Sequence, residues 1–176
     1  MTMPHDQESS AADSPVEALT KTIRRTLQAI DELTGGKYKL FSEAAVELLV
    51  GTALKESGGL RWRTQLSGGP ARGLFQMERA THDDIWTNFL AYRPPLSDAI
   101  KRTFAPAEGA LGFDQITQDD AYAALMARLK YLRVPAALPL AGDLQGQAGY
   151  WKTYYNTNLG KGTAAEYVAT WTTYIS

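Results

Sequence analysis

Glu56 is the residue of this sequence whose type and position best suit acid–base chemistry. It ends an apolar run that starts near Ser42, and Ser57-Gly58-Gly59 follows it directly. Apolar residues recur along this run at helical spacing, which places Glu56 on or beside the face that packs on the core. Apolar neighbours and the negative end of a helix dipole both disfavour the charged form of a carboxyl group. Such a group stays protonated near neutral pH and can serve as a general acid.

The segment that follows Glu56 offers groups that would bind a ligand close to this carboxyl. Trp62 and Phe75 have apolar faces suited to sugar rings, and Gln76 can hydrogen-bond an amide. Glycines within the same segment let the backbone approach a ligand closely. The alternative for either aromatic residue is that it simply packs in the core.

Helix start signals and apolar spacing predict a mainly α fold around this site. Ser42 is the expected N-cap of the helix that ends at Glu56. The other expected helices begin at Pro15, Thr81, Ser97, Thr117, Asp143 and Thr163, and they run to Leu33, Tyr92, Phe104, Pro135, Asn156 and the C-terminus.

Strand-like sequence is confined to one short segment. Arg61–Gln65 alternates as a strand does, and Ser67-Gly68-Gly69-Pro70 is a strong turn signal. We therefore expect Leu60–Phe75 to form a small irregular hairpin or a pair of loops beside the Glu56 helix. Residues 93–117, which are rich in proline and glycine, would either border or cover a cleft or form an inert elaboration.

Length and composition limit the kinds of protein to consider. The 176 residues predict one folded domain, residues 15–176, after a disordered polar tail of residues 1–14. A net charge of −1 gives no sign of a nucleic-acid partner. Cysteine is absent, which excludes disulfides and thiol nucleophiles. No apolar run is long enough for a membrane span, and the N-terminus lacks the layout of a signal peptide. We expect a monomer.

No metal or other cofactor is predicted. His5 lies in the tail and His82 at an expected helix start, so no histidine cluster with metal-ligand or triad spacing is visible. The Ser67-Gly68-Gly69 segment lacks the Lys-Ser/Thr pair that completes a phosphate-binding loop.

Two spaced motifs resemble those of the lysozyme-like lytic transglycosylases. That family reads Glu-Ser and, after a gap, Gly-Leu-Met-Gln; this chain has Glu56-Ser57 and Gly73-Leu74-Phe75-Gln76, with Phe75 where Met is usual. Tyr155-Asn156 resembles the family's later Tyr-Asn motif, and Tyr131-Leu132 lies where a Tyr-Leu pair is expected. The resemblance covers residues 40–160. The stretch Gly68–Gln76, followed by Thr81–Asp84, is similar to the sequence at this place in a phage-associated branch of the family.

The resemblance implies a lysozyme-like domain that cleaves the peptidoglycan bond between N-acetylmuramic acid and N-acetylglucosamine. Glu56 would protonate the leaving oxygen and then accept a proton from the muramic 6-hydroxyl group, which attacks the anomeric carbon and leaves a 1,6-anhydro end. Gln76 would bind an N-acetyl or peptide-stem carbonyl, and Tyr155 would hydrogen-bond Glu56 or the substrate. Ser57 would support the site, Asn156 would bind substrate beside Tyr155, and the aromatic faces of Trp62 and Phe75 would meet sugar rings. Arg61, Arg63 or Arg72 would meet the muramyl lactate or stem carboxylates, with an ordinary surface role as the alternative for each.

Hydrolysis of the same bond by a muramidase is the first alternative. Glycosidases use two carboxylates, and no Asp or Glu lies between Glu56 and Glu78. This absence favours a mechanism with one acid, whereas Glu78 or Asp83 placed within about 10 Å of Glu56 would favour hydrolysis. The alternative from another class is a non-catalytic virion or tail protein that binds glycan. In each case the protein would be made in a host cytoplasm and reach the wall by lysis, within a virion or by another export route.

Overall fold

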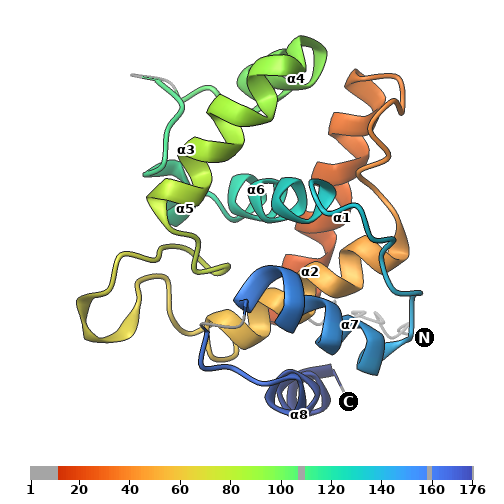
Figure 1. The fold of residues 1–176 in the computed structure, drawn as a ribbon, viewed down its shortest axis with the longest axis vertical. Coiled ribbons are helices and arrows are strands. Elements are labelled where there is room, and N and C mark those ends of the chain that lie inside the picture. The colour runs from red at the N-terminus through yellow and green to blue at the C-terminus, as the bar shows by residue number, and fades with distance from the viewer. Residues whose placement is uncertain (1–11, 107–109, 158–159, 176) are drawn as a thin grey trace, which may run out of the picture.

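A computed structural model describes residues 12–106, 110–157 and 160–175, over which the fold is mainly helical (Figure 1). The disordered tail predicted for residues 1–14 lies for the most part outside the described residues. The helical elements, in chain order, are α1 (Pro15–Leu33), α2 (Glu43–Glu56), the 3₁₀ turn η1 (Leu66–Gly68), α3 (Arg79–Asn88), the 3₁₀ turn η2 (Leu90–Tyr92), α4 (Pro94–Phe104), α5 (Gln115–Gln118), α6 (Asp120–Leu132), α7 (Leu144–Trp151), the π-helical turn η3 (Lys152–Asn156) and α8 (Ala164–Ile175).

Helix α2 is the central element of the core. Its residues from Ala45 to Leu54 are buried except for Glu47, as expected for a helix that is apolar on every side. Helices α1, α6, α7 and α8 all contact it. In Figure 1, α2 and α6 lie in the middle of the view, with α7 and α8 below them and α3 to α5 above. The burial of α2 fixes the position of its last residue, Glu56.

Several predicted N-terminal helix caps are confirmed. Ser42 caps α2, because its hydroxyl group accepts a hydrogen bond from the backbone N–H of Ala45. Asp143 caps α7 in the same way. Thr163 and Glu166 form the predicted capping box of α8, each side chain accepting a hydrogen bond from the backbone N–H of the other.

Three predicted helix starts are wrong. Helix α3 begins at Arg79 and not at Thr81, and α6 begins at Asp120 after the N-cap Asp119, whose carboxylate accepts two backbone N–H groups. The two positions expected to act as caps, Thr81 and Thr117, lie inside α3 and α5. Helix α4 begins at Pro94, because proline suits the first turn, where its missing N–H is not needed.

The segment after α2 forms loops and not a hairpin with named strands. Within the described residues, strand pairing is limited to two isolated bridges, Thr64 with Arg72 and Arg72 with Met77. The strand expected at 61–65 does not form. Positive φ angles at Gly68, Gly73 and Gln76 turn the chain too often for a continuous ladder. Of the two forms predicted for this segment, the pair of loops is the one observed.

No helix in the described part of the chain is both long enough and apolar enough to cross a bilayer.

Gly51 permits the close contact between α2 and α8. A Cβ atom at position 51 would lie 1.9 Å from the hydroxyl oxygen of Tyr167, a fully buried side chain that donates to the carbonyl oxygen of Leu48. By contrast, a Cβ atom at Gly149, also inside a helix, would meet nothing within 4 Å.

These two glycines provide a matched test of the packing. Alanine normally stabilises a helix interior relative to glycine, so Gly149→Ala is expected to raise the free energy of unfolding by about 1 kcal/mol. Gly51→Ala is expected to lower it by about 1–3 kcal/mol, because Tyr167 must move within a packed core. Urea unfolding of both variants measures the difference, and a Gly51→Ala variant as stable as wild type would contradict the described α2–α8 contact.

Candidate functional site

A cleft of ≈ 820 Å³ opens beside the C-terminal end of α2. Its walls come from the loops that follow α2, the start of α3, the end of α6 and the turn after α7. The residues that line it are Glu56, Trp62, Gln65, Leu66, Ala71, Gln76, Met77, Glu78, Thr81, Lys130, Tyr155, Asn156, Thr157, Gly160, Lys161 and Gly162. The cleft thus brings together most of the residues that the sequence motifs selected, although these are far apart in the chain.

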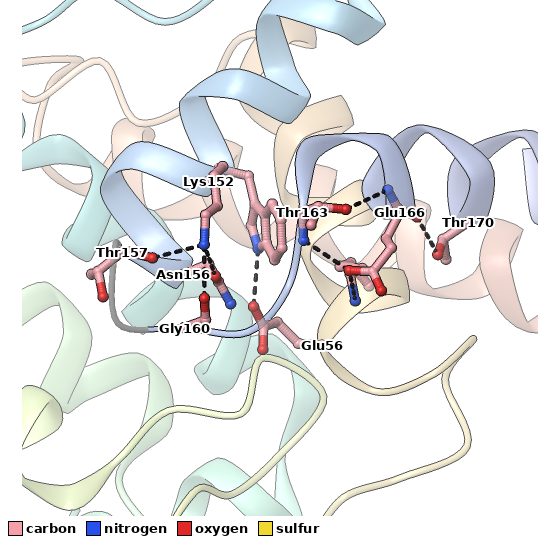
Figure 2. Close-up of polar contacts among 10 residues, drawn as sticks. Glu56, Lys152, Asn156, Thr157, Gly160, Thr163, Glu166 and Thr170 are labelled. Atoms are coloured by element: carbon pink, nitrogen blue, oxygen red, sulfur yellow. Dashed lines mark hydrogen bonds and ion pairs between the residues drawn. The ribbon is translucent and has the colours of Figure 1, made fainter.

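The Glu56 carboxyl group lies in the cleft wall, held by one hydrogen bond. The indole N–H of Trp151 donates to Glu56 Oε1 at 2.9 Å. Trp151 itself is buried, so its ring fixes this oxygen against the core. No described residue hydrogen-bonds Oε2, and Figure 2 shows the two oxygens of Glu56 pointing in different directions. One oxygen is therefore anchored and the other is available to a ligand in the cleft.

Burial raises the pKa of Glu56 above its ordinary value of 4.5. Three groups act in the opposite direction and favour the charged form: the Trp151 hydrogen bond first, and then the ammonium charges of Lys130 and Lys55. The burial effect is larger than these three together. Glu56 therefore has the property predicted from the sequence, a carboxyl group biased towards its protonated form.

Gln76 lies in the cleft, as predicted, in a strained backbone conformation. Its φ angle is 44°, a region that residues other than glycine rarely adopt. Its side-chain amide donates one hydrogen bond to the carbonyl oxygen of Gly73 at 2.9 Å. The second amide N–H and the amide oxygen have no hydrogen-bond partner among the residues described, which leaves both free for a ligand.

Tyr155 lines the cleft but does not bond Glu56. Its hydroxyl group donates to the carbonyl oxygen of Phe75 at 2.8 Å, and Trp151 bonds Glu56 instead. Of the two partners predicted for Tyr155, Glu56 is therefore wrong, and the substrate stays a prediction. Tyr155 belongs to the π-helical turn η3, a local form that recurs at functional sites. Its link to Phe75 joins this turn to the Gly73–Gln76 segment, so the two motifs meet at one wall of the cleft.

Lys152 fixes the turn after α7, which forms one wall of the cleft. Its ammonium group donates to Asn156 Oδ1 and to the carbonyl oxygens of Thr157 and Gly160, at 2.8, 3.0 and 2.8 Å (Figure 2). Asn156 therefore lies in the cleft, as expected, with its amide oxygen engaged and its NH₂ group free of described partners.

Two residues predicted at the substrate lie in the core. Phe75 is fully buried and contributes its backbone carbonyl oxygen, not its ring, to the site. Ser57 is also fully buried: its hydroxyl group donates to the carbonyl oxygen of Ala53 and accepts from the backbone N–H of Leu60. It therefore shapes the turn after α2, and neither side chain reaches the cleft.

Of the exposed aromatic and basic candidates, Trp62 lies at the cleft and the three arginines do not. Trp62 lines the cleft and remains 42% exposed, so its ring is available to a ligand. The three arginines proposed for substrate carboxylates do not line the cleft and already have partners. Arg61 bonds the carbonyl oxygen of Gly58, Arg63 pairs with Asp120, and Arg72 bonds the carbonyl oxygens of Gly69 and Ala71.

Of the two possible second carboxylates, Glu78 lines the same cleft as Glu56. Asp83 does not line the cleft, and its carboxylate lies 2.8 Å from Nδ1 of the buried His82. The described part of 93–117 supplies no residue to the cleft wall. It contributes core residues of α4 such as Leu96 and Ile100, so the interpretation as an inert elaboration is wrong for α4.

Sequence reasoning missed Trp151 and Lys130. Trp151 lies inside the helix expected from Asp143 to Asn156, and nothing local distinguished it. Lys130 is the one lysine on the largely buried face of α6, between Leu129 and Tyr131, and that placement was a usable signal. In the described part of the chain, no group of three or more His, Cys, Asp and Glu residues is arranged to hold a metal ion.

Comparisons of the chain with protein-family models, curated proteins and solved structures gave no match. Function is therefore inferred from the cleft itself and from the sequence motifs.

The raised pKa of Glu56 predicts a specific dependence of stability on pH. The neutral carboxyl group stabilises the fold fully below its unfolded pKa, and this contribution is lost as pH rises through the higher folded pKa. Gln does not titrate, so the free energy of unfolding of Glu56→Gln relative to wild type is expected to be higher at pH 8 than at pH 4. Urea unfolding at both pH values measures the change.

The control is Glu32→Gln, since Glu32 is exposed near the end of α1. It should show little change between the two pH values. A stability difference between Glu56→Gln and wild type that is the same at both, or that falls as pH rises, would contradict the raised pKa.

Proposed function

We propose that this protein cleaves the glycan strands of peptidoglycan between N-acetylmuramic acid and N-acetylglucosamine, as a lytic transglycosylase with Glu56 as its single acid and base. The observation that carries the proposal is the Glu56 carboxyl group itself. It lies in the wall of a large cleft, is biased towards its protonated form, and has one oxygen held by Trp151 and the other available. A general acid for glycosidic cleavage requires these properties.

The reaction needs two proton transfers at this one carboxyl group. Protonated Glu56 donates its proton to the glycosidic oxygen as the bond to the anomeric carbon breaks. The resulting carboxylate accepts the proton of the muramic 6-hydroxyl group, whose oxygen forms the new bond to the same carbon. Glu56 ends protonated again and the product carries a 1,6-anhydro ring. The Trp151 hydrogen bond and the nearby ammonium groups stabilise the carboxylate between the two steps.

The other free groups of the cleft fit a sugar polymer that carries amides. Trp62 offers an aromatic face for a sugar ring, and Gln76 and Asn156 present amide donors for N-acetyl or peptide carbonyls. The Glu56-Ser57 and Gly73–Gln76 motifs, which meet across this cleft, support a lysozyme-like domain of the phage-associated kind. We propose accordingly that the protein acts on the wall after lysis, from a virion or after export, as a monomer.

Hydrolysis is the second candidate function, and one observation favours it. Glu78 lines the same cleft as Glu56, and the charge of Lys130 is coupled to both carboxylates. Glu78 is thus the residue that would direct a water molecule in a two-carboxylate muramidase.

Digestion of purified sacculi tests the proposed reaction. Wild type is expected to release muropeptides with anhydro-muramic ends, which mass spectrometry distinguishes from reducing ends by the absence of one water. Loss of a general acid lowers rates by about 10²–10⁴-fold, so Glu56→Gln should release almost none. Wild type that binds sacculi but solubilises none, over several wall types, would overturn the enzyme and support the non-catalytic glycan-binding alternative.

A Glu78→Gln variant separates the two reactions. If Glu56 acts alone, Glu78→Gln should retain most of the release of anhydro ends. If Glu78 is a second catalytic carboxylate, wild type should instead release reducing ends, and Glu78→Gln should lose that activity. Circular dichroism and urea unfolding would show that both variants are folded.

A further inference from the structure

Lys130 lies at the junction of two hollows on the surface. It lines the cleft that contains Glu56, and it also lines an adjoining pocket of ≈ 530 Å³. Thr81 is the other residue that the two share. The walls of this side pocket are Ala80, Thr81, Asp84, Lys130, Arg133 and Val134. The two hollows therefore adjoin at Lys130 and Thr81, which belong to both walls.

The ammonium group of Lys130 has no ion pair in the described structure, although it is half-buried. It donates one hydrogen bond, to the carbonyl oxygen of Tyr155 at 2.9 Å, and lies 3.8 Å from the centre of the Tyr155 ring. An ammonium group has three N–H donors, so two remain without a described partner. Removal of such a charge from water is unfavourable unless a partner compensates for it.

The other charges of the side pocket are already paired. Arg133 bonds Asp84 at 2.7 Å, and the side-chain amide of Asn88 donates a second hydrogen bond to Asp84. Within the cleft, the carboxyl groups are those of Glu56 and Glu78, and the ammonium groups are those of Lys130 and Lys161. Lys130 is the one of these four that also lines the side pocket, and it makes no direct ion pair there; burial lowers its pKa, and the nearby carboxyl groups of Glu56 and Glu78 act in the opposite direction.

We propose that Lys130 binds a carboxylate carried by a substituent of the glycan substrate and thereby determines which glycans the cleft accepts. This inference rests on the proposed function, since the carboxylate is either the lactyl group of muramic acid or a group on an attached peptide. The bond to Tyr155 orients the ammonium group, and its two remaining N–H groups are the donors for the substrate.

Binding by a catalytically disabled protein tests this assignment without turnover. In the Glu56→Gln background, calorimetry would measure affinity for three soluble ligands. These are neutral N-acetylglucosamine oligomers, muramic-acid-containing oligomers with free lactyl carboxylates, and the same oligomers with peptide stems. A charge-assisted hydrogen bond predicts about tenfold tighter binding of at least one anionic ligand than of the neutral one. The ligand that shows this gain identifies the source of the carboxylate.

The Lys130→Met substitution should abolish that preference, measured as the ratio of the affinities for the anionic and the neutral oligomers. Lys130→Arg should retain the preference, because it keeps the charge. Lys101→Met is the matched control: it removes one positive charge from the exposed face of α4, away from both hollows, and should also retain the preference. Urea unfolding of each variant confirms that it is folded.

The outcomes separate the two proposals. An unchanged preference in Lys130→Met, or an equal loss in Lys101→Met, would overturn the role of Lys130 and leave the proposed function intact. Failure of the Glu56→Gln protein to bind any of the three glycans would overturn the proposed function as well.

Discussion

The hydrogen bond between Trp151 and Glu56 is the contact on which the account of this site depends. It joins the end of α2 to the end of α7, and it fixes one oxygen of a carboxyl group whose pKa is raised by burial. Behind it, Lys55 lies 5.7 Å from the Trp151 ring and 3.6 Å from the Glu166 carboxylate of α8. A half-buried carboxyl group opposes stability at neutral pH, and proteins accept this cost chiefly at functional sites.

Most of the helices were predictable because their signals are local. Ser42 and Asp143 cap their helices through backbone groups a few residues away, so the sequence alone identifies them. The wrong helix starts have a different origin. Thr81 has the sequence spacing of a cap, but the chain is already helical from Arg79, and Asp84 is drawn to Arg133 on another element. Whether Asp84 supports a cap or pairs with Arg133 depends on tertiary contacts, which a short sequence motif does not reveal.

The candidate site was predictable in composition but not in its contacts. Glu56 and Gln76 reach the cleft because helix periodicity and glycine placement determine their positions. Phe75 is fully buried in the hydrophobic core, and a single aromatic residue in a sequence carries no sign of which face it presents. The partner of Glu56 proved to be Trp151 and not Tyr155, since the π-helical turn directs the Tyr155 hydroxyl group to a backbone carbonyl.

The most direct test of the central claim is the titration of the Glu56 carboxyl group. Its ¹³C resonance, assigned by its absence in Glu56→Gln, can be followed from pH 3 to pH 9 alongside the pH profile of glycan cleavage. The account predicts a midpoint above the ordinary value of 4.5 and a fall in kcat/KM at high pH with the same midpoint. A midpoint at or below the ordinary value, or a cleavage rate that does not follow this titration, would contradict Glu56 as the general acid.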